Sequence, residues 1–333
     1  MTDKASRPDE DQQVARAQQL AASLLEEAGR RRTGHERRQS ARLSRILAEP
    51  EGRTLILALT DEVLRIRDPR RAARVLAGLV RVGKGTAVLG PVDRLSLRVG
   101  AELAPLLPGV VVPLARRRVR AEMGGVILPA GGVQLAKHAA ERGAQGMRLN
   151  VNVLGEAILG DDEAERRLAR IVATLDHPAI DYVSVKVSSI CAQIDVVRFD
   201  YEVERIATRL RRLFDKALSF DPPKFVNLDM EEFRDLELTL AVFKKVLDEA
   251  PYRQMPAGVV LQAYLPDSLP ALEELCRWGR TRHARTGGWI KVRLVKGANL
   301  AMEHVEAEIR GWPSAPFLSK EETDAQYKRL LDV

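Results

Sequence analysis

From about residue 147 onward, short β-rich runs alternate with amphipathic helical segments, and this alternation constrains the fold more than any other feature. The runs cover residues 147–156, 182–189, 224–231, 257–265 and 289–295. A strand followed by a helix, repeated in this way, predicts right-handed βαβ units and a parallel sheet. Helices cover such a sheet either as a doubly wound open sheet or as a (β/α)8 barrel.

The polar residues of these runs help to choose between the two architectures. Each run alternates apolar side chains with polar ones, and the polar ones are Asn150 and Asn152, Ser184, Lys186 and Ser188, Asn227 and Asp229, Gln262 and Tyr264, and Lys291 and Arg293. Strands of a doubly wound sheet are buried on both faces and are typically continuous apolar runs. The alternation therefore favours a barrel with a polar interior, in which the strand ends bring Lys186, Asp229, Gln262 and Arg293 together.

Each of these residues, taken alone, also fits a purely structural role. Lys186 and Asp229 could form a structural ion pair, and Gln262 could satisfy backbone groups. A buried guanidinium at Arg293 needs an acid or a ligand with acceptor atoms. Four polar faces on successive strands are a stronger indication of a ligand site than any one of these residues.

The region before the barrel is predicted to be all α-helical. Residues 1–82 read as a helical arm or cap, with helices over 9–32 and 36–48 and a further helix that starts at Asp68-Pro69. Residues 83–146, where Gly and Pro recur at irregular intervals, read as a linker domain of short helices joined by loops. Residues 147–333 then form the barrel domain.

Composition excludes several classes of protein. The formal net charge is +7, yet the excess is mostly arginine spread along helices, so we expect a solvated surface and no nucleic-acid partner. Two cysteines and five histidines show no metal-ligand spacing, and we expect both cysteines to be ordinary buried thiols. No apolar run approaches the length that spans a bilayer, and the start lacks the apolar centre of a signal peptide. These features favour a cytoplasmic protein.

Several short stretches resemble the proline dehydrogenase domain of the bifunctional proline-utilisation flavoenzymes. The matching stretches are LGEA (154–157), SVKVSS (184–189), NLDMEE (227–232), VLQAYL (260–265), RLVKGA (293–298), Glu303 and KEETDAQYKRLL (320–331). They occur in the order and spacing of that family. The resemblance implies a distorted (β/α)8 barrel that holds FAD at the carboxyl ends of its strands.

Carried over position by position, the resemblance implies roles for individual residues. Lys186, Asp229 and Arg293 would be the catalytic residues, with Lys186 helping to hold the substrate carboxylate and Asp229 ordering the charged network of the pocket. Gln262 and Arg293 would hydrogen-bond the flavin ring. The residues that would complete the cofactor site are Asp229, Val295, Lys296, Gly297, Ala298, Thr323 and Asp324.

The reaction implied is hydride transfer from L-proline to the flavin, which yields Δ1-pyrroline-5-carboxylate, the first step of proline catabolism to glutamate. Reduced flavin would pass its electrons to a membrane quinone, which would require peripheral contact with the inner face of the cell membrane. The resemblance also implies an aldehyde dehydrogenase domain further along a longer chain and a homo-oligomer.

The sequence departs from the family pattern in two places. Asn299 and Leu300 stand where many members have aromatic residues, which weakens the case for FAD contacts from that loop. About five strand-helix units are present where a barrel needs eight. We therefore expect the chain to be part of a longer polypeptide, and we do not expect full activity from this segment alone.

Two other functions remain open on the residues alone. One is a Schiff-base lyase or aldolase barrel in which Lys186 or Lys296 is the nucleophile. The other is a non-catalytic module, in which the helical region mediates dimerisation and the incomplete barrel serves as a scaffold.

Overall fold

The computed structural model describes residues 10–59, 63, 66, 68–82, 91–123, 133–153 and 158–333. Contacts divide the chain into two compact units, Met1–Leu128 and Pro129–Val333. The division predicted from sequence, with boundaries after residues 82 and 146, remains a prediction. The LGEA stretch (154–157) lies outside the described residues.

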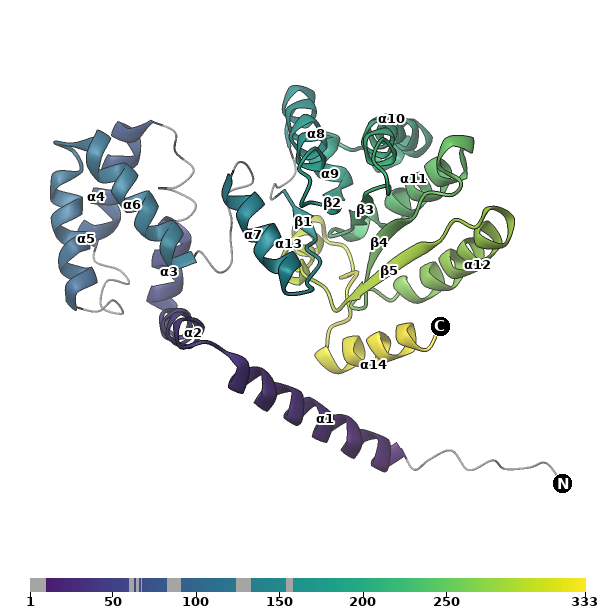
Figure 1. The fold of residues 1–333 in the computed structure, drawn as a ribbon, viewed down its shortest axis with the longest axis horizontal. Helices are drawn as coiled ribbons and strands as arrows, with labels where there is room; N and C mark the ends of the chain where they lie inside the picture. The colour runs from purple at the N-terminus through teal and green to yellow at the C-terminus, as the bar shows by residue number, and fades with distance from the viewer. Residues whose placement is uncertain are drawn as a thin grey trace. The chain divides into compact units, whose positions relative to one another are not determined.

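The described part of the first unit is helical (Figure 1). Its helices are α1 (Glu10–Arg31), α2 (Gly34–Ala48), α3 (Pro50–Ala58), α4 (Pro69–Val82), α5 (Pro91–Leu103) and α6 (Pro108–Met123). The helix start predicted at Asp68-Pro69 is confirmed, because the Asp68 carboxylate accepts hydrogen bonds from the backbone N–H groups of Arg70 and Arg71 at the start of α4. Among the described residues of this unit, a buried core cluster consists of Val63, Ala72, Ala73, Leu76, Ala104 and Val112.

The second unit contains a five-stranded sheet in which every neighbouring pair of strands is parallel, in the order β1-β2-β3-β4-β5. The strands are β1 (Val151–Asn152), β2 (Tyr182–Lys186), β3 (Phe225–Asp229), β4 (Ala257–Gln262) and β5 (Ile290–Val295). The helices are α7 (Val133–Ala144), α8 (Asp161–Leu175), α9 (Val187–Ile190), α10 (Phe199–Leu218), α11 (Leu236–Asp248), α12 (Ser268–Thr286), α13 (Leu300–Arg310) and α14 (Lys320–Leu331). The predicted βαβ units are confirmed.

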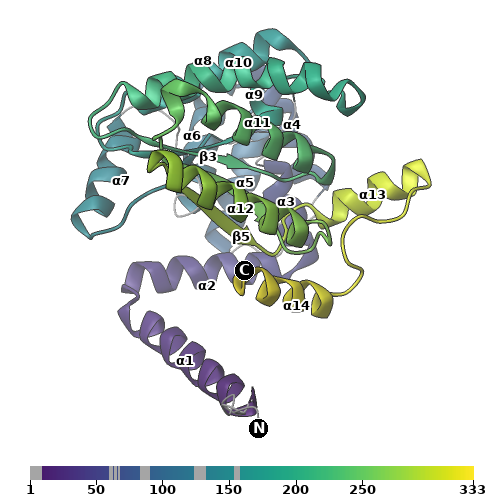
Figure 2. The ribbon, with the colours of Figure 1, turned by 90° about the vertical axis from the view of Figure 1, so that its right-hand side faces the viewer.

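One face of the sheet packs against helices, as the alternation predicts. Figures 1 and 2 show α8, α10, α11 and α12 on this face. The apolar residues of the strands are buried beneath them, for example Val183 and Val185 of β2 at 1% exposure and Leu228 of β3 at 1%. The large rings of Phe214 on α10 and Phe243 on α11 are fully buried in the same core. This packing leaves the other face of the sheet for the polar residues.

The strand register aligns the polar residues in rows. Ser184 lies opposite Asn227, and Lys186 lies opposite Asp229. The alternation is weaker than predicted in β4, where Gly258 and Val260 share the face of Gln262. Gly258 has a steric reason, because a Cβ atom there would lie 2.4 Å from the Asn227 side-chain oxygen.

Two predicted strands are shorter than the sequence suggests. In the described part of the first run, residues 147–153, strand forms at Val151–Asn152. The run 182–189 ends as strand at Lys186, where the chain turns into α9, so Ser188 lies on a helix. The barrel is open in this chain, with five strands of the expected eight, and β1 and β5 form its two edges.

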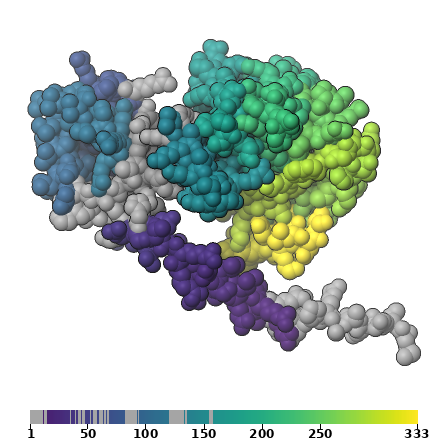
Figure 3. Space-filling model, viewed as in Figure 1, coloured from purple at the N-terminus to yellow at the C-terminus, as the bar shows by residue number. Residues whose placement is uncertain are grey.

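At the end of the chain, α14 packs on β5 and α12 (Figure 3, yellow). The Gln326 side chain donates a hydrogen bond to the Pro266 carbonyl at 3.3 Å, which holds this helix beside the end of β4. In the described parts of both units, we find no helix with the length and apolar character needed to cross a membrane.

Candidate active site

Asp229, at the end of β3, is the centre of a hydrogen-bonded cluster on the polar face. One carboxylate oxygen accepts hydrogen bonds from Arg293 at 2.5 Å and from Asn227 at 2.8 Å. The other accepts one from Asn152 at 3.0 Å. Burial raises the pKa of Asp229 above its usual value, and it outweighs the opposing effect of the Arg293 guanidinium. The acid that a buried Arg293 was expected to need is therefore Asp229.

Lys186, at the end of β2, pairs with a different carboxylate. Its ammonium lies 2.6 Å from a carboxylate oxygen of Glu231, two residues beyond Asp229. The structural ion pair considered between Lys186 and Asp229 is not formed, although the two residues are neighbours in register. Two separate cation–carboxylate pairs thus stand side by side at the strand ends.

Gln262 links the ends of three strands. It is fully buried, and its amide nitrogen donates to the Glu231 backbone carbonyl at 2.8 Å. Its amide oxygen accepts from the Ala298 backbone N–H at 3.1 Å. Gln262 therefore holds the turn after β3 against the turn after β5, and a hydrogen bond from it to a flavin ring remains a prediction.

The turn after β5 has a backbone that requires glycine. Gly297 has φ 141°, and a Cβ atom there would lie 2.5 Å from the Tyr264 ring. Beside it, the Lys296 ammonium forms an ion pair with Asp324 on α14 at 2.5 Å. Thr323 on the same helix is 9% exposed, and its hydroxyl donates to the Ser319 carbonyl. Val295, the last residue of β5, lies opposite Gln262.

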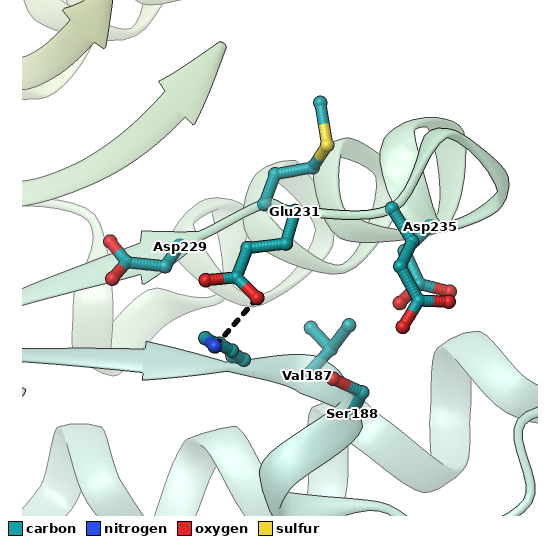
Figure 4. A pocket seen from close by; sticks show the side chains of 8 residues that line it. Val187, Ser188, Asp229, Glu231 and Asp235 are labelled. Atoms are coloured by element: carbon teal, nitrogen blue, oxygen red, sulfur yellow. Dashed lines mark ion pairs between the residues drawn. The ribbon is translucent and has the colours of Figure 1, made fainter. Parts of the chain in front are cut away.

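Two residues of this region were missed by the sequence analysis. Glu231 continues the period-two alternation past Asp229, so its place on the polar face was readable from NLDMEE. Asp235 follows in a short turn, and no periodicity marks it. Both line a small cavity at the strand ends together with Lys186, Val187, Ser188, Asp229, Met230 and Glu232 (Figure 4).

The cysteines are less uniform than expected. Cys191 is buried, and its burial raises the pKa of the thiol to about 11, which keeps it protonated. Cys276 is only partly buried. Neither residue lines the cavity at the strand ends.

The residues expected to hold FAD suit a planar ring with acceptor atoms. The Nε–H of Arg293 is buried and has no hydrogen-bond partner among the described residues. An unpaired buried donor of this kind is stabilised when an acceptor reaches it.

Fold and site together define a (β/α)-barrel domain with its charged residues at the carboxyl ends of the strands. The family model of proline dehydrogenase matches residues 135–333, which is more than half of the chain. The chain belongs to the proline dehydrogenase family.

Solved structures with similar folds are proline utilization A proteins. One from Corynebacterium freiburgense is 48% identical over 65% of this chain, with a TM-score of 0.62. One from Bdellovibrio bacteriovorus, inactivated by N-propargylglycine, is 25% identical over 87% of this chain, with a TM-score of 0.66. The chain spans only 22% and 29% of the length of these two proteins. No curated protein matches the chain.

Proposed function

We propose that this chain is the proline dehydrogenase part of a proline-utilisation flavoenzyme and oxidises L-proline to Δ1-pyrroline-5-carboxylate. One observation carries the proposal beyond family membership: the pairs Lys186–Glu231 and Arg293–Asp229 stand together at the carboxyl ends of adjacent and next-adjacent strands. In barrel enzymes this end of the strands is where substrates bind. A zwitterionic amino acid suits a site that presents both signs of charge.

The Lys186 ammonium would hold the carboxylate of L-proline. Lys186 pairs with the Glu231 carboxylate, and the substrate carboxylate would take the place of that carboxylate. Asp229 would act on Arg293: hydrogen bonds from Asn227 and Asn152 hold its carboxylate, which in turn accepts one from the guanidinium and fixes it at the strand ends. Fixing a charged group in advance removes an entropic cost from binding.

FAD, when bound, would supply the hydride acceptor. Arg293 would offer its unpaired Nε–H to the flavin ring, and Gln262 is the second expected partner of the ring. The rest of the proposed cofactor site consists of Asp229, Val295, Lys296, Gly297, Ala298 and Thr323. The residues of the chain bind and orient, while the bound flavin carries the redox chemistry.

Further partners belong to the same proposal. Because the similar structures are longer proteins, we also propose that an aldehyde dehydrogenase domain lies elsewhere in a longer chain. Assembly into a homo-oligomer is part of the same proposal. A membrane quinone would reoxidise the flavin, so the protein would be cytoplasmic and would visit the membrane surface.

The test is an absorbance spectrum of the purified full-length natural protein, recorded before and after anaerobic addition of L-proline. We expect flavin bands that bleach with L-proline and return when a soluble quinone is added. Lys186→Met should keep the flavin but need far more L-proline for bleaching, while Arg293→Met should lower the flavin content. Lys244→Met, a remote lysine paired with Glu274, is the matched control. A colourless protein that takes up no FAD contradicts the proposal.

The same experiment addresses the two alternatives. A Schiff-base enzyme needs a lysine that is free to attack its substrate, whereas Lys186 is paired with Glu231 and Lys296 with Asp324. Loss of activity after borohydride treatment with substrate would nevertheless favour that chemistry. Absence of both flavin and turnover in the full-length protein would favour the scaffold.

A further inference from the structure

Asp235 is a buried carboxylate without an obvious structural role. It stands at the start of α11, where its side chain makes no capping hydrogen bond. It is 4% exposed, and its Oδ1 has no hydrogen-bond partner in the described structure. The nearest cation is the Arg234 guanidinium, with its Nε 3.8 Å from that oxygen, too far for a hydrogen bond. A buried polar atom of this kind calls for a partner.

The cavity at the strand ends lies between Asp235 and the Lys186–Glu231 pair (Figure 4). The cavity has a volume of about 10 Å³. This is roughly the room that one water molecule needs, and the polar lining offers that molecule several partners. A single water molecule in the cavity can therefore connect the Asp235 carboxylate to the site by hydrogen bonds.

Asp235 differs from the other carboxylates that line the cavity. Each of the others is matched by a cation at short range, whereas Asp235 is not. The matched pairs are Glu231 with Lys186 at 2.6 Å, Asp229 with Arg293 at 2.5 Å and Glu232 with Arg234 at 2.7 Å. Burial raises the pKa of Asp229 as well, but its oxygens already accept three hydrogen bonds. Asp235 has an unpaired Oδ1 and is therefore the lining carboxylate best able to take up a proton.

The groups around Asp235 bring its pKa close to the value that a proton acceptor needs. Burial, reinforced by the charges of Glu232 and Glu303, raises the pKa of Asp235 to about 6, while Arg234 opposes the shift. Glu303 reaches the turn from α13 and accepts a hydrogen bond from the Phe233 N–H at 2.7 Å, and burial raises the pKa of this carboxyl too. A proton acceptor works best with a pKa near the working pH.

We propose that Asp235, acting through one water in this cavity, takes up the proton that the substrate amine must release. The inference rests on the proposed function. L-proline binds as a secondary ammonium; one N–H bond breaks and its electron pair stays on nitrogen. The proton passes to the water, and a proton of that water passes to an Asp235 oxygen. The neutral amine can then release hydride from the adjacent carbon. Asp235 returns its proton to solvent after product leaves.

The experiment measures the anaerobic rate of flavin reduction by saturating L-proline, in the full-length protein, from pH 5 to 9. The wild type should show an inflection near pH 6, below which the rate falls. Asp235→Asn should lose this inflection and slow the reaction at pH 7.5 by about 100-fold, a usual contribution of proton transfer. Glu303→Gln should move the inflection to lower pH, because it removes one of the charges that raise the pKa of Asp235. Glu274→Gln, on the surface of α12, is the matched control.

An infrared spectrum gives a readout that needs no turnover. A protonated-carboxyl band should titrate near pH 6 in the wild type and be absent in Asp235→Asn. An Asp235→Asn protein with the wild-type rate and pH profile would overturn the inference, as would a wild type without that titrating band. If Asp235→Asn does not fold, Glu303→Gln decides, since an unmoved inflection contradicts the inference. A wild type whose flavin is not bleached by L-proline at any pH sinks the proposed function instead.

Discussion

The two units of this chain are built from different kinds of interior. In the described residues of the first unit the buried side chains are all apolar, and five of the six core residues are alanine or valine. The second unit buries large rings such as Phe214 and Phe243. It also buries every polar and charged side chain found buried in the described chain, among them Asp229, Asp235 and Gln262. A larger core can stabilise buried polar groups that a small one cannot, because each such group costs free energy.

The charge of the chain is divided in the opposite way. Residues 1–128 contain 24 Lys and Arg against 15 Asp and Glu, and residues 129–333 contain 29 against 31. The net positive charge thus belongs to the first unit, and the unit with the site is close to neutral. The charges that carry the proposed chemistry are distinguished by burial and pairing, and net charge by itself reveals nothing about them.

The largest expected effect tests whether the two cores are independent. Phe243→Ala removes a fully buried ring that packs edge-on against Trp278 at 5.9 Å, and should cost about 4 kcal/mol of the free energy of unfolding. All three tryptophans lie in the second unit, so denaturant unfolding followed by their fluorescence reports that unit. Leu76→Ala in the first unit should leave the fluorescence transition unchanged. It should shift only the transition that is followed by circular dichroism. Transitions that move together in both variants would contradict independent cores.

A smaller effect depends on the buried charge of the second unit. The folded pKa of Asp235, about 6, lies above the ordinary 3.8, so this group stabilises the fold below pH 3.8 and that stability is lost as the pH rises through 6. Asp235→Asn does not titrate, and relative to the wild type it should gain about 2 to 3 kcal/mol between pH 4 and pH 7.5. Urea unfolding at both pH values measures the gain. A constant difference would mean that Asp235 keeps its ordinary pKa.

Replacing glycine by alanine should change stability in opposite directions in the two units. Gly258→Ala in β4 places a methyl group 2.4 Å from the Asn227 oxygen and 3.0 Å from the Phe225 ring, and should cost about 2 kcal/mol. Gly78→Ala in α4 meets nothing within 4 Å and should stabilise its helix by about 0.5 to 1 kcal/mol. Thermal unfolding compares the two variants. Equal effects would contradict the difference in packing.

The smallest effect concerns two helix N-caps of the same type, one in each unit. Thr33 with Glu36 starts α2, and Ser319 with Glu322 starts α14, each as a reciprocal pair of hydrogen bonds. Replacing either cap residue by alanine should cost about 1 kcal/mol. Thr33→Ala should lower the helical circular dichroism, because the described side chains of α1 and α2 are almost all exposed. Ser319→Ala should leave it unchanged, since Leu330 and Gln326 anchor α14 in the second unit.

The sequence by itself determined the parallel sheet, the helical first unit and the polar face of the strands. These follow from local periodicity, and periodicity of two places Lys186, Asp229 and Arg293 on one face whatever else the chain does. The start of α4 at Asp68 was readable for the same reason, because a cap is a local interaction.

Only the tertiary structure decided which charges pair and which stay alone. Lys186 and Asp229 are neighbours in register, yet Lys186 turns to Glu231 and Asp229 to Arg293, two strands away. Asp235 is buried with an unpaired Oδ1, and α13 brings a further carboxylate, Glu303, to its turn from a position 70 residues beyond the Phe233 N–H that it binds. Burial and pairing depend on contacts between distant segments, and no pattern along the chain encodes them locally.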